Sequence, residues 1–209
     1  MSAHIAYAFV TLLVIVDPVG TAAIFAGLMR GVPEEFARRM AWRATLIAGA
    51  LMLAFALLGD ALLEALGISL PAFRIAGGLL LFLLATDMVF ARPSGIRFPT
   101  LPEQEEAARS TDVSVFPLAF PLLAGPGALT SIVLLMGRAG SPLEAAGVIA
   151  ALAAVLALTL VALRSAAWVL RRLGVTGANV ISRVLGIILA ALAAQLVLDG
   201  VAEFLGRGA

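Results

Sequence analysis

The chain contains no cysteine, no lysine and only one histidine, His4, among its 209 residues. Without cysteine there can be no disulfide, no thiolate metal site and no thiol catalysis. Charged residues make up 13% of the chain, against about 25% in soluble domains. The net charge is +1, so the chain lacks the basic excess that attracts nucleic acid. We therefore expect neither a soluble domain nor a nucleic-acid partner.

Apolar residues dominate instead, at 62% of the chain, with a mean hydropathy of +1.10. A spanning helix needs about 20 mostly apolar residues. Six segments meet this requirement, at residues 5–28, 41–58 (extending to 66), 70–90, 113–136, 143–163 and 180–205. No basic region precedes the first segment, so we expect no cleaved signal peptide. The sequence predicts an all-α membrane protein with six transmembrane helices, in contact with the lipid bilayer.

The longest polar interval, "ARPSGIRFPTLPEQEEAARSTD", covers residues 91–112. Its proline, serine and charged residues are typical of an exposed loop. It divides one membrane domain into a first three-helix repeat at 1–91, a loop at 92–112 and a second three-helix repeat at 113–209.

Arginine placement predicts the orientation. The loops after the first, third and fifth spans carry most of the arginines: Arg30, Arg38, Arg39, Arg43, Arg92, Arg97, Arg109, Arg164, Arg171 and Arg172. Positively charged loops face the cytoplasm. We therefore expect the 92–112 loop in the cytoplasm, both termini outside or in the periplasm, and the chain in the cell (inner) membrane.

The two halves resemble each other. "FRIAGGLLLFLLA" at 73–85 aligns with "SRVLGIILAALAA" at 182–194, placing Arg74 on Arg183. The interval from Pro18 to Arg74 is 56 residues, and that from Pro126 to Arg183 is 57. Because each half has an odd number of spans, the second must be inverted relative to the first. The spacing predicts a 3+3 inverted repeat, as in many secondary transporters.

Proline interrupts the first and fourth spans near their centres, at Asp17-Pro18 and Gly125-Pro126. Proline is accommodated at the first position of a helix, where its missing N–H has no helical partner anyway. We therefore expect two broken helices, with Asp17 and Gly125 as N-caps. The exposed backbone groups cannot face lipid and must line a cavity or be buried in protein.

Two such breaks can meet at the bilayer centre. Helix N-termini attract a carboxylate, and free carbonyls with Asp17 attract an ammonium or a cation. Small residues nearby leave room for the ligand, and hydroxyls can contact it. The expected substrate-binding residues are Asp17, Pro18, Gly20, Thr21, Gly125, Pro126, Gly127, Thr130 and Ser131.

Other interpretations remain open at this point. Proline kinks often serve packing alone, and Asp17 can be a cap that never touches a ligand. An ion or small-solute channel, or an exporter of the same fold, is the alternative to an amino-acid transporter. An enzyme is disfavoured, because no histidine or cysteine lies in a span and no metal-type carboxylate cluster occurs. We expect no cofactor; a coupling ion, Na⁺ or H⁺, and a homo-oligomer are compatible with the sequence.

Three stretches, "DPVGTAAIF", "PLAFPLLAGPGALTSIVLL" and "ISRVLGIILAALAAQLVLDGV", resemble the MarC family of six-span membrane proteins. This family includes the SnatA-type transporters of small neutral amino acids. The resemblance covers nearly the whole chain. It implies broken first and fourth helices and a small zwitterionic amino acid, such as glycine or alanine, as substrate. Many members have Asn at the position of Thr21 and Pro at that of Ala23, so this chain lacks an amide donor there.

The predicted orientation can be tested by thiol labelling, because the chain has no cysteine of its own. A Ser2→Cys variant should react with impermeant thiol reagents added outside intact cells, after permeabilisation of any outer membrane. A Ser94→Cys variant should react only after lysis. The reverse pattern would overturn the orientation, and equal labelling would indicate dual topology.

Overall fold

The computed structural model describes residues 2–90 and 112–206. The described residues form helices and no strand: α1 (Ser2–Val16), α2 (Pro18–Leu28), α3 (Glu34–Ala65), α4 (Leu70–Phe90), η1 (Ser114–Leu123), α6 (Pro126–Gly137), α7 (Pro142–Arg164) and α8 (Ala166–Gly206). Residues 91–111, which make up nearly all of the expected cytoplasmic loop 92–112, lie outside the described part of the chain.

Five long apolar stretches in the described residues can each cross a membrane, namely His4–Leu28, α3, α4, α7 and the part of α8 from Thr176 to Gly206. η1 and α6 together form a bent pair, which meets at 56° and is a sixth candidate span. The described residues therefore contain five candidate spans, and the expected six if the bent pair counts as one span. The described residues are those of an all-helical, multi-pass membrane protein.

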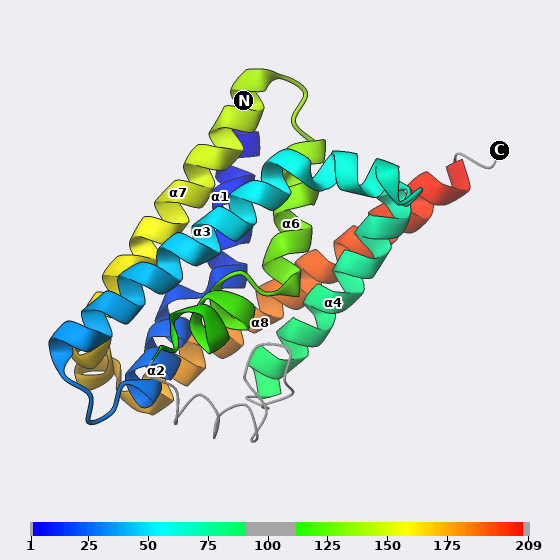
Figure 1. Ribbon diagram of the computed structural model, residues 1–209. Coiled ribbons are helices and arrows are strands. Elements are labelled where there is room, and N and C mark those ends of the chain that lie inside the picture. The colour runs from blue at the N-terminus through cyan, green and yellow to red at the C-terminus, as the bar shows by residue number, and fades with distance from the viewer. Residues whose placement is uncertain (1, 91–111, 207–209) are drawn as a thin grey trace.

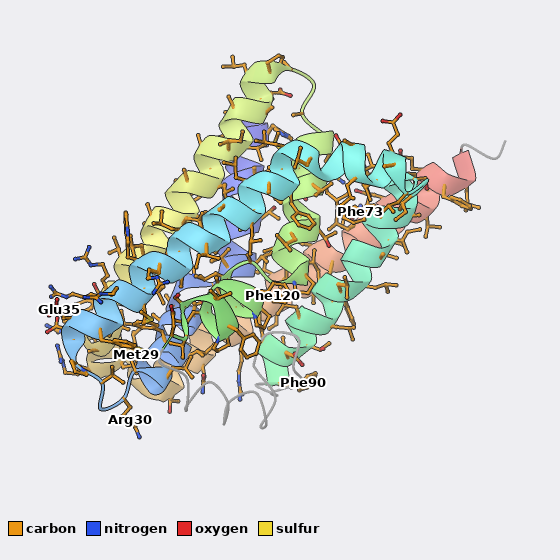
Figure 2. The ribbon with its side chains drawn as sticks, in the orientation of Figure 1. Met29, Arg30, Glu35, Phe73, Phe90 and Phe120 are labelled. Atoms are coloured by element: carbon orange, nitrogen blue, oxygen red, sulfur yellow. The ribbon has the colours of Figure 1, made fainter. Side chains whose placement is uncertain are left out.

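The connections lie at two opposite ends of the bundle (Figure 1). The connection between α2 and α3 is at one end, where Figure 2 shows Met29, Arg30 and Glu35, and the lower end of α4 with Phe90 lies on the same side. Both termini and the α3–α4 and α6–α7 connections are at the other end. We name these the inner end and the outer end, after the orientation that the arginines predict.

Each long helix packs against partners from the other half of the chain. α4 lies along α8, α1 and α2 pack against α7, and α3 packs against η1 and α6 (Figure 1). In addition, α2 contacts α8, α6 contacts α4, and α3 contacts α7. The core between them consists mostly of Ala, Leu, Val and Met. As a result, the two interrupted spans lie inside the bundle.

Two spans differ from their expected limits. α3 ends at residue 65, close to the longer limit of 66 that the sequence predicted for the second span. It begins at Glu34, before the apolar run at 41–58. α8 begins at Ala166 rather than near 180, and is kinked at Gly174, where φ is +66°. This left-handed conformation is one that glycine adopts without steric cost. The apolar pattern missed the first turns of α8 because they carry Arg171 and Arg172.

An ion pair at the inner end attaches the fourth span to α3. Arg43 lies 2.7 Å from the carboxylate of Asp112. The side chain and backbone N–H of Ser114 both donate to Asp112, at 2.6 and 2.9 Å. These hydrogen bonds, with a smaller contribution from Arg43, hold the pKa of Asp112 below its ordinary value. The negative charge of Asp112 thus stays at the start of η1, where it is stabilised.

Candidate functional site

Asp17 forms the interruption of the first span. Its backbone is left-handed, with φ 44° and ψ 73°, and its side chain is completely buried. One carboxylate oxygen accepts the N–H of Gly20 at 3.0 Å, and the other accepts the hydroxyl of Ser182 in α8 at 2.7 Å. Asp17 is therefore the N-cap of α2, with Pro18 in the first helical position, as the sequence predicted.

The backbone around Asp17 is largely hydrogen-bonded within the span. The N–H of Asp17 donates to Leu13, and its carbonyl accepts from Thr21, both at 2.9 Å. The Thr21 hydroxyl donates to the carbonyl of Val16 at 2.7 Å. The chain from His4 to Leu28 therefore continues as one span through the interruption. The predicted cap is therefore present, and it takes up the N–H of Gly20, one of the donors at this helix N-terminus.

The fourth span is broken more strongly. Before the break, η1 contains Pro117 and Pro121, each after a cis peptide bond, and the backbone is extended at Phe116 and Phe120. The segment before the break is therefore irregular, because two prolines interrupt it. After the break, α6 begins with Gly125 as N-cap and Pro126 in the first turn.

The N-terminus of α6, unlike that of α2, has no side-chain cap. Gly125 has no side chain to accept a hydrogen bond, and the first N–H groups of a helix have no partner within it. In α6 these belong to Gly127 and Ala128, since Pro126 has no N–H. This end of α6 thus presents donors and the positive end of the helix dipole to whatever lies before it.

A small cavity adjoins this N-terminus. Its volume is about 10 Å³, and it is lined by Gly125, Pro126, Gly127 and Ala128, by Leu84 of α4 and by Ile15 of α1, among others. Ile15 lies two residues before Asp17, so the first span reaches this cavity close to its own break. A cavity of this size holds about one water molecule. The expected room for an amino acid is therefore closed in this conformation.

The glycines at the fourth-span break are close to other protein groups. A Cβ added at Gly127 would lie 2.8 Å from Leu81 Cδ2 in α4, and one added at Gly125 would overlap the carbonyl of Pro121. We expected these glycines to let a ligand approach the backbone. In this conformation they let helices approach it instead.

The two expected hydroxyl residues of α6 have different surroundings. Thr130 donates to the carbonyl of Pro126 at 2.9 Å, and its methyl group occupies the space where Gly77 of α4 lacks a side chain. Ser131 lines a second cavity with Thr11 of α1. Thr130 therefore belongs to the break, whereas Ser131 belongs to another part of the bundle.

Sequence reasoning missed Ser182, although it contacts Asp17 directly. The repeat alignment places Ser182 opposite Phe73, so the other half offered no polar counterpart. The available signal was its position, next to Arg183 at the start of the aligned segment. Together the structure gathers Asp17, Pro18, Gly20, Thr21 and Ser182 at one break, and Gly125, Pro126, Gly127 and Thr130 at the other.

Because α8 lies close to the first break, adding one methyl group at Gly20 should destabilise the protein. A Cβ at Gly20 would overlap both the Asp17 carboxylate and the Ser182 hydroxyl. Gly20→Ala should therefore separate these two groups and lower the free energy of unfolding by about 2–3 kcal/mol, the worth of a hydrogen bond to a charged group. Denaturant or thermal unfolding in detergent measures the change.

Gly27→Ala is the matched control, since Gly27 lies in the same helix and nothing lies within 4 Å of its added Cβ. This variant should be neutral or stabilised by up to about 1 kcal/mol, as for alanine in place of glycine in a helix. Equal stability of the two variants would mean that the contact between Asp17 and Ser182 does not support the fold.

Comparison with known proteins agrees with this architecture. Residues 2–205 match the family described as "MarC family integral membrane protein". A membrane protein of Archaeoglobus fulgidus is 35% identical over 93% of this chain and 91% of its own length. YvbG of Bacillus subtilis is 30% identical, over 94% and 93%, and YhcE of Escherichia coli is 32% identical, over 92% and 89%. All three are named only as UPF0056 membrane proteins.

No solved structure matches the chain significantly. The family match nonetheless extends along almost its whole length, and relatives at 30% identity or more align over nearly all of it. The chain belongs to the MarC family of integral membrane proteins.

Proposed function

We propose that the chain transports small neutral amino acids, such as glycine or alanine, across the cell membrane. The substrate binds near the bilayer centre, between the breaks of the first and fourth spans. The observation that carries the proposal is the uncapped N-terminus of α6, which opens onto a cavity that Ile15, two residues before Asp17, also lines.

The two breaks are suited to opposite ends of a zwitterion. At α2 the N-terminus is occupied by the Asp17 carboxylate, so this break presents negative charge and attracts the ammonium group. At α6 the N–H groups of Gly127 and Ala128 have no side-chain cap, so this break attracts the carboxylate. Each charge–dipole contact contributes up to about 2 kcal/mol when partly buried. Contacts of this size correspond to weak, readily reversible binding, which a transporter requires to release its cargo.

The packing of the helices supports the 3+3 inverted repeat. The repeat exchanges the first span with the fourth, the second with the fifth and the third with the sixth. Under this exchange, the α1–α7 contact corresponds to the η1–α3 contact, and the α2–α7 contact corresponds to the α6–α3 contact. The α2–α8 contact corresponds to the α6–α4 contact. The α4–α8 and α3–α7 contacts are converted into themselves. In transporters built this way, one repeat moves against the other around the substrate site.

An open pocket of about 310 Å³ at the inner end supports access from that side. Its walls come from α2, α3 and the α7–α8 junction, and include Phe25, Met29, Ala37 and Leu163. Met29 and its neighbour Arg30 lie at the end of α2 (Figure 2). A volume of several hundred Å³ admits small solutes. In this proposal the pocket is the inner entrance to the route, and it is wider than the cavity at the fourth-span break.

An ion channel or ion transporter is the alternative, because Asp17 is a buried carboxylate at an intramembrane break. Buried carboxylates within membranes often belong to cation or proton pathways. Substrate selectivity separates the two proposals, since an ion site does not recognise a carboxylate.

Ligands that lack one pole test the zwitterion model. Glycine and alanine should bind the purified protein, measured by calorimetry or thermal shift. Glycine methyl ester and N-acetylglycine should not, because each has lost one of the two charges. Tryptophan should be rejected for its size. An ester that stabilises the protein as well as glycine does would contradict the role of the α6 N-terminus.

Asp17→Asn should abolish glycine binding, because it removes the charge that holds the ammonium group. The matched control is Asp60→Asn, an equal change at an exposed position of α3. If a bare cation stabilises the protein and no amino acid does, the ion pathway replaces this proposal.

A further inference from the structure

A second cavity lies between α1, α6 and α8, on the outer side of the two breaks. Its volume is about 10 Å³, and its walls include Tyr7 and Thr11 of α1, Ser131 and Arg138 of α6, and Leu196 of α8. Thr11 precedes Asp17 by six residues and Ser131 follows Pro126 by five. Because α1 runs from the outer end to its break and α6 runs from its break to the outer end, both hydroxyls lie in the outer half of the bundle.

Two buried hydroxyls in this cavity have no hydrogen-bond partner. Thr11 is 5% exposed and Ser131 is 2% exposed, and neither side-chain oxygen is bonded. Other buried threonines of the protein donate to the carbonyl four residues earlier, as Thr45, Thr130 and Thr159 do at 2.7 to 2.9 Å. Helix geometry offers Thr11 and Ser131 the same bond, and they do not make it. A buried hydroxyl without a partner is unfavourable, so these two are prepared for a group that enters the cavity.

Arg138 and Asp199 form an ion pair at the same cavity. A guanidinium nitrogen of Arg138 lies 3.0 Å from one Asp199 oxygen, and the Gln195 amide donates to the other at 2.7 Å. Arg138 follows the last residue of α6, the helix that begins at the fourth-span break. About 18 Å of helix therefore separates the N–H donors at the break from the guanidinium, with Ser131 between them.

We propose that this cavity is the outer part of the substrate route. Arg138 separates from Asp199 and then binds the carboxylate of the substrate there. The proposal rests on the amino-acid transport proposed above. Arg138 is suited to this role because its guanidinium binds carboxylates with two parallel hydrogen bonds. Asp199 is the carboxylate that it binds in the closed conformation, so substrate and Asp199 compete for the same group. Thr11 and Ser131 provide hydroxyls to the solute between the break and Arg138.

The outer end is closed by a second pair as well. Arg74 of α4 lies 2.5 Å from Glu203 of α8, with its side chain only 11% exposed. Both pairs join α8 to another helix at the outer end, whereas the inner end has one pair, Arg43–Asp112, and an open pocket. A conformation open at the inner end and closed at the outer end is what an alternating-access transporter adopts in one half of its cycle.

Cysteine accessibility tests the route, since the protein has no cysteine. Ser131→Cys changes only one atom type, and the thiol should react slowly with an impermeant reagent added from the outer side. Val133→Cys is the matched control: Val133 lies in the same helix, is also 2% exposed, and packs against Gly59 of α3 instead. It should not react from either side.

Asp199→Asn, added to each cysteine variant, should open the route by removing the partner of Arg138. We expect labelling of Ser131→Cys to become about tenfold faster, since loss of one ion pair shifts such an equilibrium by about this factor. Labelling of Val133→Cys should remain absent. If Ser131→Cys resists the outer reagent even with Asp199→Asn, the cavity is not part of a route and the inference is wrong, whether or not glycine is transported.

Arg138→Gln tests recognition in reconstituted vesicles of known orientation. The KM for glycine presented to the outer side should rise about tenfold, as expected for loss of a charge-assisted hydrogen-bond pair, while the KM from the inner side stays unchanged. Arg43→Gln, at the inner end, should leave the outer KM unchanged. An equal rise on both sides would overturn the role of Arg138 at the outer cavity. If the unmodified protein binds no amino acid yet Asp199→Asn accelerates labelling, the transport proposal fails and the gated route stands.

Discussion

A backbone that crosses lipid must find hydrogen-bond partners for its N–H and C=O groups within the protein. In the first span, the hydrogen bonds around Asp17 meet this requirement. Pro18 removes one helical donor, and the N–H of Gly20 turns to the Asp17 side chain. The Thr21 hydroxyl then bonds the carbonyl of Val16. A left-handed aspartate costs about 1–3 kcal/mol of backbone strain. Its carboxylate offsets that cost by bonding both Gly20 and Ser182, which also attaches α8 to the break.

The fourth span meets the same constraint without a charged residue, and the difference gives the site its polarity. Gly125 leaves the α6 N-terminus uncapped, and Pro117 and Pro121 leave η1 irregular. If Gly125 were an aspartate like Asp17, both breaks would present a carboxylate. The two breaks therefore differ in charge, with an N-terminus capped by a carboxylate at α2 and an uncapped N-terminus at α6. In the proposed function, this difference suits a zwitterion better than a simple anion.

Proline and hydropathy carried most of what the sequence predicted. Pro18 and Pro126 mark the breaks, because proline excludes a helical hydrogen bond at a fixed position. Other features depend on contacts between distant residues. The hydrogen bond from Ser182 to Asp17 joins residues 165 positions apart, so no local sequence pattern predicts it. Arg74 and Arg183 align in sequence, yet Arg74 is buried beside Glu203 and Arg183 is exposed. Similar helices thus acquire different surroundings once the halves pack together.

α8 contributes polar partners to three other helical spans among the described residues. Ser182 bonds Asp17 at the first break, Asp199 bonds Arg138 after α6, and Glu203 bonds Arg74 of α4. From Ser182 to Asp199 the helix is about 25 Å long, so its polar residues lie beside the first break and near the outer end. A helix moves largely as a rigid body. A displacement of α8 that separates Asp199 from Arg138 therefore also changes the position of Ser182 at Asp17. In the proposed route, the outer ion pairs and the charge at the first break therefore belong to one mechanical element.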